Sequence, residues 1–284
     1  MTGQETDNRP GLLLRLAGPL QSWGEKSHFT DRDTARFPTR SGVIGMLAAA
    51  LGRERGASLD DLTALSLTVR VDRPGVLLTD LHTVGGGLPA RDTVTTAEGK
   101  KRSGTTATLL SHRAYLADAA FTVALTSTAS GPGPEAVNRF AEALREPRWP
   151  LFLGRRSCPP EGPVLLARSD RPLHDLVLLP VAAERAKGAG ALDIVFLSEA
   201  PLDALPVPDG WKSTPEAEAA RATSTINDDP RSFHPKRRTY LSRQLYRRVV
   251  SLPEDRFAGL GSAYLAQLRR HLAVNPAHPE RGNP

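Results

Sequence analysis

Residues 11–19 read GLLLRLAGP, an apolar run that a glycine and a proline close. A run of this length, bounded by turn residues, is typical of a short buried strand. The following residues are irregular up to Pro38, after which Thr39 can cap a helix that Gly52 ends. The apolar residues that recur there at helical spacing are Val43, Ile44, Leu47 and Leu51. The first fifty residues therefore predict a strand followed by a helix.

Four more elements follow in the next hundred residues. Residues 65–71 alternate between apolar and polar side chains, and residues 115–126 have the same period, so both predict half-buried strands. Pro134 suits the start of a helix. Residues 163–167 complete the series as a strand. The order strand, helix, strand, strand, helix, strand is the βαββαβ order of a ferredoxin-like domain, which RNA-recognition modules also use. We therefore predict an α+β fold whose first domain, residues 11–169, is ferredoxin-like or RRM-like.

The connection between the two middle strands is much longer than a hairpin requires. It spans about residues 79–113 and contains the run TTAEGKKRSGTTATLLSHR. Long connections inside compact domains are usually functional or disordered. Its basic side chains and its Thr, Ser and Gly residues could donate hydrogen bonds to phosphates. The sequence thus predicts an inserted loop that contacts nucleic acid, although a solvated variable loop remains open.

After about residue 170 proline and glycine become frequent and the apolar runs shorten. The segments LHDLVLLPV and LDIVFL read as short strands, so residues 170–252 predict a small β-rich C-terminal subdomain. Residues 253–284 form a tail that contains an amphipathic helix, FAGLGSAYLAQLRRHL. Between residues 231 and 253 there are seven basic residues and no acidic one, with Tyr240 and Tyr246 among the arginines. Such interleaving is typical of an RNA surface, and the charged outer face of an edge hairpin is the alternative.

Composition limits the class of protein. The chain has 284 residues, a net charge of +6 and a single cysteine, Cys158. One cysteine permits no intramolecular disulfide, which fits a reducing cytoplasm. Nothing approaches 18 consecutive apolar residues, so we expect no membrane span. The histidines have no metal-ligand spacing and no nucleotide-binding or nucleophile motif is present, so we expect neither a metal nor a cofactor.

One enzymatic alternative survives. A metal-independent ribonuclease needs only a general base, a general acid and a cation near the scissile phosphate. His112, with Arg113 or Lys101, could supply part of that set. No acid–base partner of His112 lies close in the sequence, and the first 114 residues contain no tyrosine. Metal-independent cleavage of RNA thus remains an alternative to simple RNA binding.

Five ordered blocks of sequence carry a resemblance to a known family. They are LRLAGPLQSWG (14–24), RFPTRSGVIGMLAAALG (36–52), DLHTV (80–84), HRAYLADAAFTVAL (112–125) and FLGRRSCPP (152–160). In this order they closely resemble the CasD family, the type I-E branch of the fifth family of CRISPR-associated proteins, within the RAMP superfamily. The basic segment near Arg237 fits the C-terminal part of the family more loosely.

The resemblance implies a function in antiviral defence. Members of the family have a modified RRM-like domain with a thumb inserted between the middle strands. They hold the 5′ handle of the crRNA in the Cascade complex, beside the backbone subunit of the seventh Cas family and the large subunit that reads the PAM. Target DNA is then contacted only indirectly. Related type I-C members cleave RNA with a tyrosine, a lysine and a histidine; the tyrosine position would fall near residues 48–51, which contain none.

The resemblance also suggests roles for individual residues. Arg40 and Ser41 stand where the first helix begins, where free backbone N–H groups could meet a phosphate. Trp23, close to Gln21, could stack on a base or hold its loop to the core. The remaining candidates for RNA binding are Lys100, Lys101, Arg102, His112, Arg113, Arg155 and Arg156.

Two of these assignments leave alternatives open. Phosphate contact and an internal ion pair are both possible for Arg155 and Arg156. We expect Cys158 to be a small buried side chain and not a nucleophile, because reactivity requires a depressed pKa. None of the candidates is expected to be catalytic.

Overall fold

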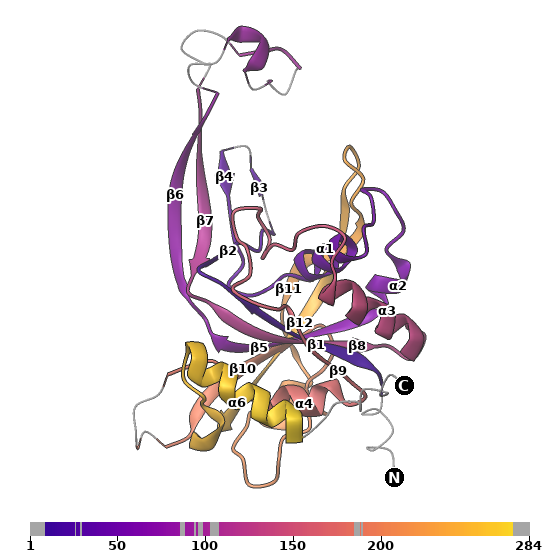
Figure 1. Ribbon diagram of the computed structural model, residues 1–284, viewed down its shortest axis with the longest axis vertical. Helices are drawn as coiled ribbons and strands as arrows, with labels where there is room; N and C mark the ends of the chain where they lie inside the picture. Colours follow the sequence, from indigo (N-terminus) through magenta and orange to yellow (C-terminus); the bar gives the residue numbers. More distant parts are fainter. Residues whose placement is uncertain are drawn as a thin grey trace.

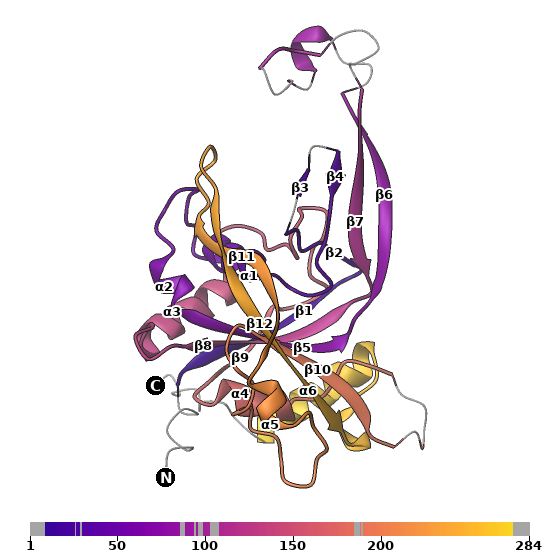
Figure 2. The same ribbon diagram turned by 180° about the vertical axis from the view of Figure 1, so that it is seen from behind.

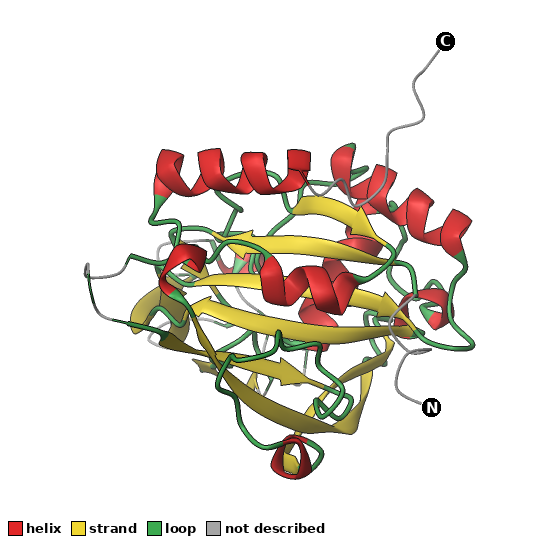
Figure 3. Cartoon of the chain, turned by 90° about the horizontal axis from the view of Figure 1, so that it is seen from below, coloured by secondary structure: helices red, strands yellow, loops and turns green. Residues whose placement is uncertain are grey.

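A seven-stranded antiparallel sheet crosses the whole molecule (Figures 1 and 3). The computed structural model describes residues 9–25, 27–28, 30–85, 89–93, 95, 99–102, 108–184, 188 and 190–274. In spatial order the strands are β11 (Ala222–Ser232), β12 (Thr239–Leu252), β10 (Leu192–Ser198), β5 (Leu65–Arg73), β8 (Ala120–Ser127), β1 (Gly11–Ala17) and β9 (Leu165–Ser169).

Helices cover both faces of this sheet, so the molecule is a layered α+β structure. On one face lie α1 (Arg40–Ala50), α2 (Asp60–Thr63) and α3 (Pro134–Arg145). On the other lie α4 (Pro172–Leu178), α5 (Glu216–Ala219) and α6 (Gly261–Val274). Short 3₁₀ turns occupy Ala90–Asp92 and Glu254–Arg256.

Strand β1 explains why both faces are covered. Leu12, Leu14 and Leu16 belong to the core that α1 and α3 close, whereas Leu13 and Ala17 belong to the core beneath α4 and α6. Successive side chains of a strand point to opposite faces, so an unbroken apolar run has two faces to bury. The opening run of the sequence therefore sets the three-layer arrangement.

A two-stranded arm projects from the sheet (Figure 1). Its strands β6 (Val76–Val84) and β7 (Leu109–Ala117) pair along their full length. At the base of the arm β7 also pairs with β2 (Leu20–Gln21). About halfway along, it pairs in parallel with β4 (Asp31–Arg32), which in turn pairs with β3 (Ser27–His28).

Both strands of the arm bend away from the sheet at positions that lie opposite each other. Gly75 has a φ of 69°, and a Cβ there would lie 2.6 Å from the carbonyl oxygen of Ala117. Opposite it, Asp118 has a φ of 55°. The Arg73 guanidinium donates to the backbone oxygen and to Oδ1 of Asp118, both at 2.6 Å. Only glycine fits the first bend, and one ion pair joins the two bends.

Most of the predicted elements are confirmed, including the strand at residue 11, the helix after Thr39 and the helix at Pro134. Three predictions were wrong. Residues 115–126 form the end of β7 and then β8, because the bend at Asp118 breaks the strand. The connection at about 79–113 was predicted as an inserted loop, but the two ends of this connection belong to β6 and β7, which pair as a hairpin. The segment LHDLVLLPV contains helix α4, in which Pro172 starts the helix and Leu176 and Val177 are buried.

Candidate nucleic-acid interface

Two adjoining cavities, of about 470 Å³ and about 880 Å³, lie along helix α1. They have six lining residues in common: Ser41, Gly42, Gly154, Phe233, Arg238 and Tyr240. Because these residues line both cavities, we treat the two as one groove, the α1 groove.

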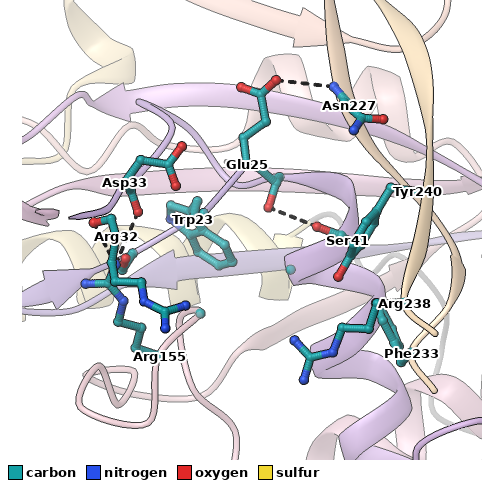
Figure 4. A pocket seen from close by; sticks show the side chains of 15 residues that line it. Trp23, Glu25, Arg32, Asp33, Ser41, Arg155, Asn227, Phe233, Arg238 and Tyr240 are labelled. Atoms are coloured by element: carbon teal, nitrogen blue, oxygen red, sulfur yellow. Dashed lines mark hydrogen bonds between the residues drawn. The ribbon is translucent and has the colours of Figure 1, made fainter. Parts of the chain in front are cut away.

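Three elements build the α1 groove. Its floor is a face of α1 that carries mostly small side chains, at Ser41, Gly42, Gly45, Ala48 and Ala49, together with Met46. One wall is the loop after α3, from Trp149 to Arg156. The other is the β11–β12 hairpin, whose Phe233, Arg238 and Tyr240 face Ser41 and Trp23 in Figure 4. The glycines let aromatic rings approach α1 closely, since a Cβ on Gly45 would lie 3.6 Å from the Phe233 ring.

The charge of the lining is mainly positive. Six arginines line the groove: Arg32, Arg53, Arg55, Arg155, Arg156 and Arg238. Three acidic residues oppose them: Glu25, Asp33 and Glu54. The rings of Phe233 and Tyr240 lie 6.4 Å apart and tilted by 57°. Cations interleaved with aromatic rings are typical of surfaces that bind single-stranded nucleic acid.

Gln21 and Trp23 are buried instead of exposed. Trp23 is 1% exposed, and its Nε1 donates to Oε1 of Gln21 at 2.9 Å. Gln21 Nε2 donates to the carbonyl oxygens of Leu16 and Ala119. A Cβ on Gly42 would lie 2.7 Å from the Trp23 ring, so the indole packs directly on α1. The burial of Trp23 favours the role of holding its loop to the core over stacking on a base.

Arg40 also differs from the expectation. Its side chain is 4% exposed, and it donates to Asp229, Glu199 and the carbonyl oxygens of Leu65 and Thr63. The backbone N–H of Arg40 donates to Oδ2 of Asp228 at 2.7 Å. A protein carboxylate thus occupies the place where a phosphate was expected at the start of α1. Ser41, the next residue, lines both cavities.

This buried network joins α1 to the hairpin wall of the groove. Arg243 of β12 donates to both carboxylate oxygens of Asp228, at 2.6 and 2.9 Å. Burial raises the pKa of Glu199, whereas the positive charges of Arg40 and Arg243 lower it. Charges this deeply buried require their partners, because an unpaired ion in the interior is costly. The network therefore fixes the width of the groove.

Arg155 and Arg156 have different environments. Arg155 donates to the carbonyl oxygens of Ala114, Arg32 and Asp33, and its guanidinium lies 4.8 Å from the centre of the Tyr115 ring. It therefore fastens the loop to the base of the arm, through carbonyl groups and not through an ion pair. Arg156 is exposed and lines the larger cavity.

The remaining five candidates belong to the two-stranded arm and its tip (Figure 2), and none of them lines the groove, although Arg113 pairs in the β-sheet with the groove-lining Arg32. Lys100 is exposed, Lys101 Nζ donates to the carbonyl oxygen of Thr93 at 2.9 Å, and the carbonyl of Arg102 accepts from Thr93 Oγ1. Farther down the arm, His112 is exposed on β7, and Arg113 Nε donates to Ser111 Oγ at 3.3 Å. The candidates thus do not form one site.

Sequence reasoning missed several groove residues, among them Arg53, Arg55, Trp149 and Phe233. The basic segment after residue 231 did signal Arg238 and Tyr240, but it could not separate them from arginines with structural roles. Arg248, for example, is 4% exposed and donates to the carbonyl oxygens of Leu202, Asp203 and Leu205. The two walls of the groove come from segments that are far apart in the sequence, so the sequence does not show that their residues lie together.

Groups suited to chemistry are sparse in the described part of the chain. Cys158 is fully buried, and burial raises the pKa of its thiol, as expected of a packing residue. No cluster of three metal-ligating side chains occurs among the described residues. No helix in the described ranges is both long and apolar enough to cross a membrane.

Comparison with known proteins gave consistent matches. A family model described as CRISPR-associated protein (Cas_Cas5) matches residues 11–246. The "CRISPR system Cascade subunit CasD" of Escherichia coli (strain K12) is 40% identical over 165 residues, which are 56% of this chain and 70% of the relative. A chain of a solved "CRISPR RNA-guided surveillance complex" is similar with a TM-score of 0.75 and 41% identity, covering 93% of this chain and 99% of that one. A structure titled "Crystal structure of Cas protein" gives a TM-score of 0.56 and 31% identity, covering 88% and 98%.

Proposed function

Because this chain belongs to the CRISPR-associated Cas5 family, we propose that it is the crRNA-binding subunit of a type I-E Cascade complex. In this role it holds the 5′ handle of the crRNA in the α1 groove and leaves sequence discrimination to guide base pairing. The observation that carries this assignment is the groove itself, with its floor on α1, its aromatic side chains and its six arginines.

Arg156 and Arg238 are the residues best placed to contact phosphates. Both line the groove and are exposed, and neither makes a hydrogen bond or ion pair within the described ranges. By contrast, the guanidinium groups of Arg40, Arg155 and Arg243 donate hydrogen bonds to protein groups. Guanidinium groups without protein partners keep all their donors for a ligand.

The direct test is RNA binding at several salt concentrations. We expect Arg156→Gln and Arg238→Gln each to weaken binding of handle RNA and to reduce the slope of log K against log salt by about 0.7 per lost phosphate contact. Arg269→Gln and Arg270→Gln are the matched controls, because they remove the same charge from the exposed face of α6. Equal losses of RNA affinity in all four variants would show that only net charge matters and would refute RNA binding in the α1 groove.

We further propose that the N-terminal part has the ferredoxin-like arrangement. The supporting observation is the spatial order β5, β8, β1, β9, with α1 and α3 packed on one face. The division into an RRM-like part (11–169, with a thumb at about 79–113), a β-rich part (170–252) and a helical tail (253–284) is retained as a proposal. The pairing of β10 with β5 implies that the first two parts share one sheet.

Partners follow from the same assignment. We propose that the arm, as the thumb, and the groove together contact the crRNA, the neighbouring backbone subunit and the large PAM-reading subunit. The complex would act in the cytoplasm, with target DNA met only through the crRNA.

We propose that the subunit does not cleave RNA. In support, residues 48–51, at the end of α1 and its C-cap, are Ala, Ala, Ala and Leu, and Tyr115 is 3% exposed beneath Arg155. Purified protein incubated with repeat RNA should leave it intact, with or without the substitution His112→Ala. Cleavage that His112→Ala abolishes would establish the ribonuclease alternative instead.

A further inference from the structure

An exposed indole stands at the far end of the α1 groove. Of the three tryptophans, Trp23 is 1% exposed, and Trp211 is partly buried beneath the guanidinium of Arg256. Trp149 is 40% exposed and lines the larger cavity, together with Pro150 and Phe152. A large aromatic surface left in water is costly unless a ligand covers it.

The loop that presents Trp149 is held in place on both sides. The backbone N–H of Arg148 donates to the carbonyl oxygen of Ala50 at 2.9 Å. The backbone N–H of Leu153 donates to the carbonyl oxygen of Cys158 at 2.7 Å. The stem of Arg148 also covers Gly52, where a Cβ would lie 2.6 Å from its Cγ. The loop backbone that carries the indole is therefore held before any ligand arrives, and this lowers the entropic cost of binding.

The surroundings of Trp149 combine apolar and cationic groups. The apolar residues Met46, Ala48, Ala49 and Leu59 line the same cavity. The guanidinium groups of Arg55 and Arg156 lie on this lining and make no hydrogen bond or ion pair with the described residues. One acidic side chain, Glu54, is present. A flat apolar surface bordered by free cations suits a nucleobase that carries phosphates on either side.

We propose that Trp149 is the stacking platform of a subsite for one unpaired nucleobase of the bound RNA, with Arg55 and Arg156 receiving the adjacent phosphates. This inference rests on the proposed function and adds to it a position at which one base is held. Stacking depends on a π face that every base has, so the subsite would detect the presence of a base and not its identity.

The test uses the full-length protein and a synthetic single-stranded RNA with the repeat-derived 5′ end, together with a series in which each nucleobase in turn is replaced by an abasic site. For the wild type we expect one abasic position to weaken binding about tenfold. Trp149→Ala should bind the intact RNA about as weakly as the wild type binds that one abasic RNA, and should no longer distinguish the two. Trp149→Phe should restore the distinction in part.

A spectroscopic readout reports on Trp149 itself. RNA should quench part of the tryptophan fluorescence of the wild type and much less of that of Trp149→Phe. Leu265→Ala, at an exposed residue of α6, is the control and should behave as the wild type.

The outcomes separate the subsite from the function. If the wild type binds the RNA but no abasic position matters, or if Trp149→Ala weakens every RNA in the series equally, the subsite is refuted and the function stands. If the wild type binds no RNA, the proposed function fails. If Trp149→Ala leaves all RNA binding unchanged but releases a protein subunit from the complex, the occupant is a peptide and the proposal is overturned.

Discussion

At the scale of single residues, side chains of one type serve opposite purposes. Arg40 and Arg156 were both predicted to bind RNA, but Arg40 is 4% exposed and bonded to protein groups, whereas Arg156 is exposed in the groove. Nothing local in the sequence distinguishes them. The partners of Arg40 lie up to 189 residues away, at Asp229, so only the folded chain reveals the difference.

These two arginines give a paired prediction. Arg40→Met removes the guanidinium that pairs with Glu199 and Asp229, so we expect the free energy of unfolding to fall by about 3–5 kcal/mol. The RNA affinity of the folded fraction should change little. Arg156→Met should do the reverse, keeping stability and losing affinity. Urea unfolding and RNA titration of both variants check this; a stable Arg40→Met that has lost RNA binding would contradict it.

A second residue-scale prediction concerns alkaline pH. Burial raises the pKa of Tyr264 to about 12, and the negative charge of Asp72 adds to the effect. The folded chain therefore retains a proton that the unfolded chain releases above about pH 10. This contribution to stability is complete below that pH and is lost as the pH rises towards 12.

The matching variant isolates this effect. Between pH 10 and pH 12, the wild type should lose on the order of 2 kcal/mol more unfolding free energy than Tyr264→Phe. Urea unfolding at a series of pH values measures it. Parallel losses in the two proteins would show that the hydroxyl titrates as freely in the folded state as in the unfolded one.

At the scale of elements, regular patterns were predicted well and interruptions were not. The alternation in residues 65–71 and the apolar spacing after Pro134 each depend on one buried face, which the sequence displays directly. The strand predicted over residues 115–126 failed because one residue, Asp118, adopts a left-handed conformation. Strand β6 was missed because its side chains are largely exposed, so burial imposes no period on it.

The arm makes its own prediction. If its tip grips phosphates, replacing Lys100, Lys101 and Arg102 with Ala should weaken crRNA retention in the assembled complex and flatten its salt dependence. The bond from Thr93 Oγ1 to the carbonyl oxygen of Arg102 should survive the triple substitution, whereas the bond from Lys101 Nζ to the carbonyl oxygen of Thr93 is lost, so circular dichroism of the variant is the control for its fold. Salt-gradient dissociation of the crRNA measures the effect. An unchanged salt slope would leave the arm a purely protein-contacting element.

At the scale of the whole molecule, the sequence suggested two subdomains, while the strand pairing joins them. Strand β10 pairs with β5 from Val195↔Val71 to Ser198↔Thr68. The core beneath α4 and α6 combines Leu13 and Ala124 with Val250 and Leu252. Such pairing between distant segments follows from three-dimensional packing, which composition shifts along the chain do not encode.

We therefore expect a single cooperative unfolding transition. Circular dichroism and tryptophan fluorescence should give the same urea midpoint, and a chain ending at residue 169 should not fold, because β5 and the lower core would lose their partners. Two separated transitions, or a folded truncated chain, would show that residues 170–252 are independent of the rest.

The bends at Gly75 and Asp118 set a mechanical requirement for the arm. With nine residues in each strand and a rise of about 3.3 Å per residue, the outer end of the paired strands stands roughly 30 Å from the root of the arm. A rotation of about 10° at the root would move that end by about 5 Å, more than the length of a hydrogen bond. The direction in which the arm projects is thus set by Arg73, Gly75 and Asp118. Substitutions at the root should misplace every contact at the tip without altering a single tip residue.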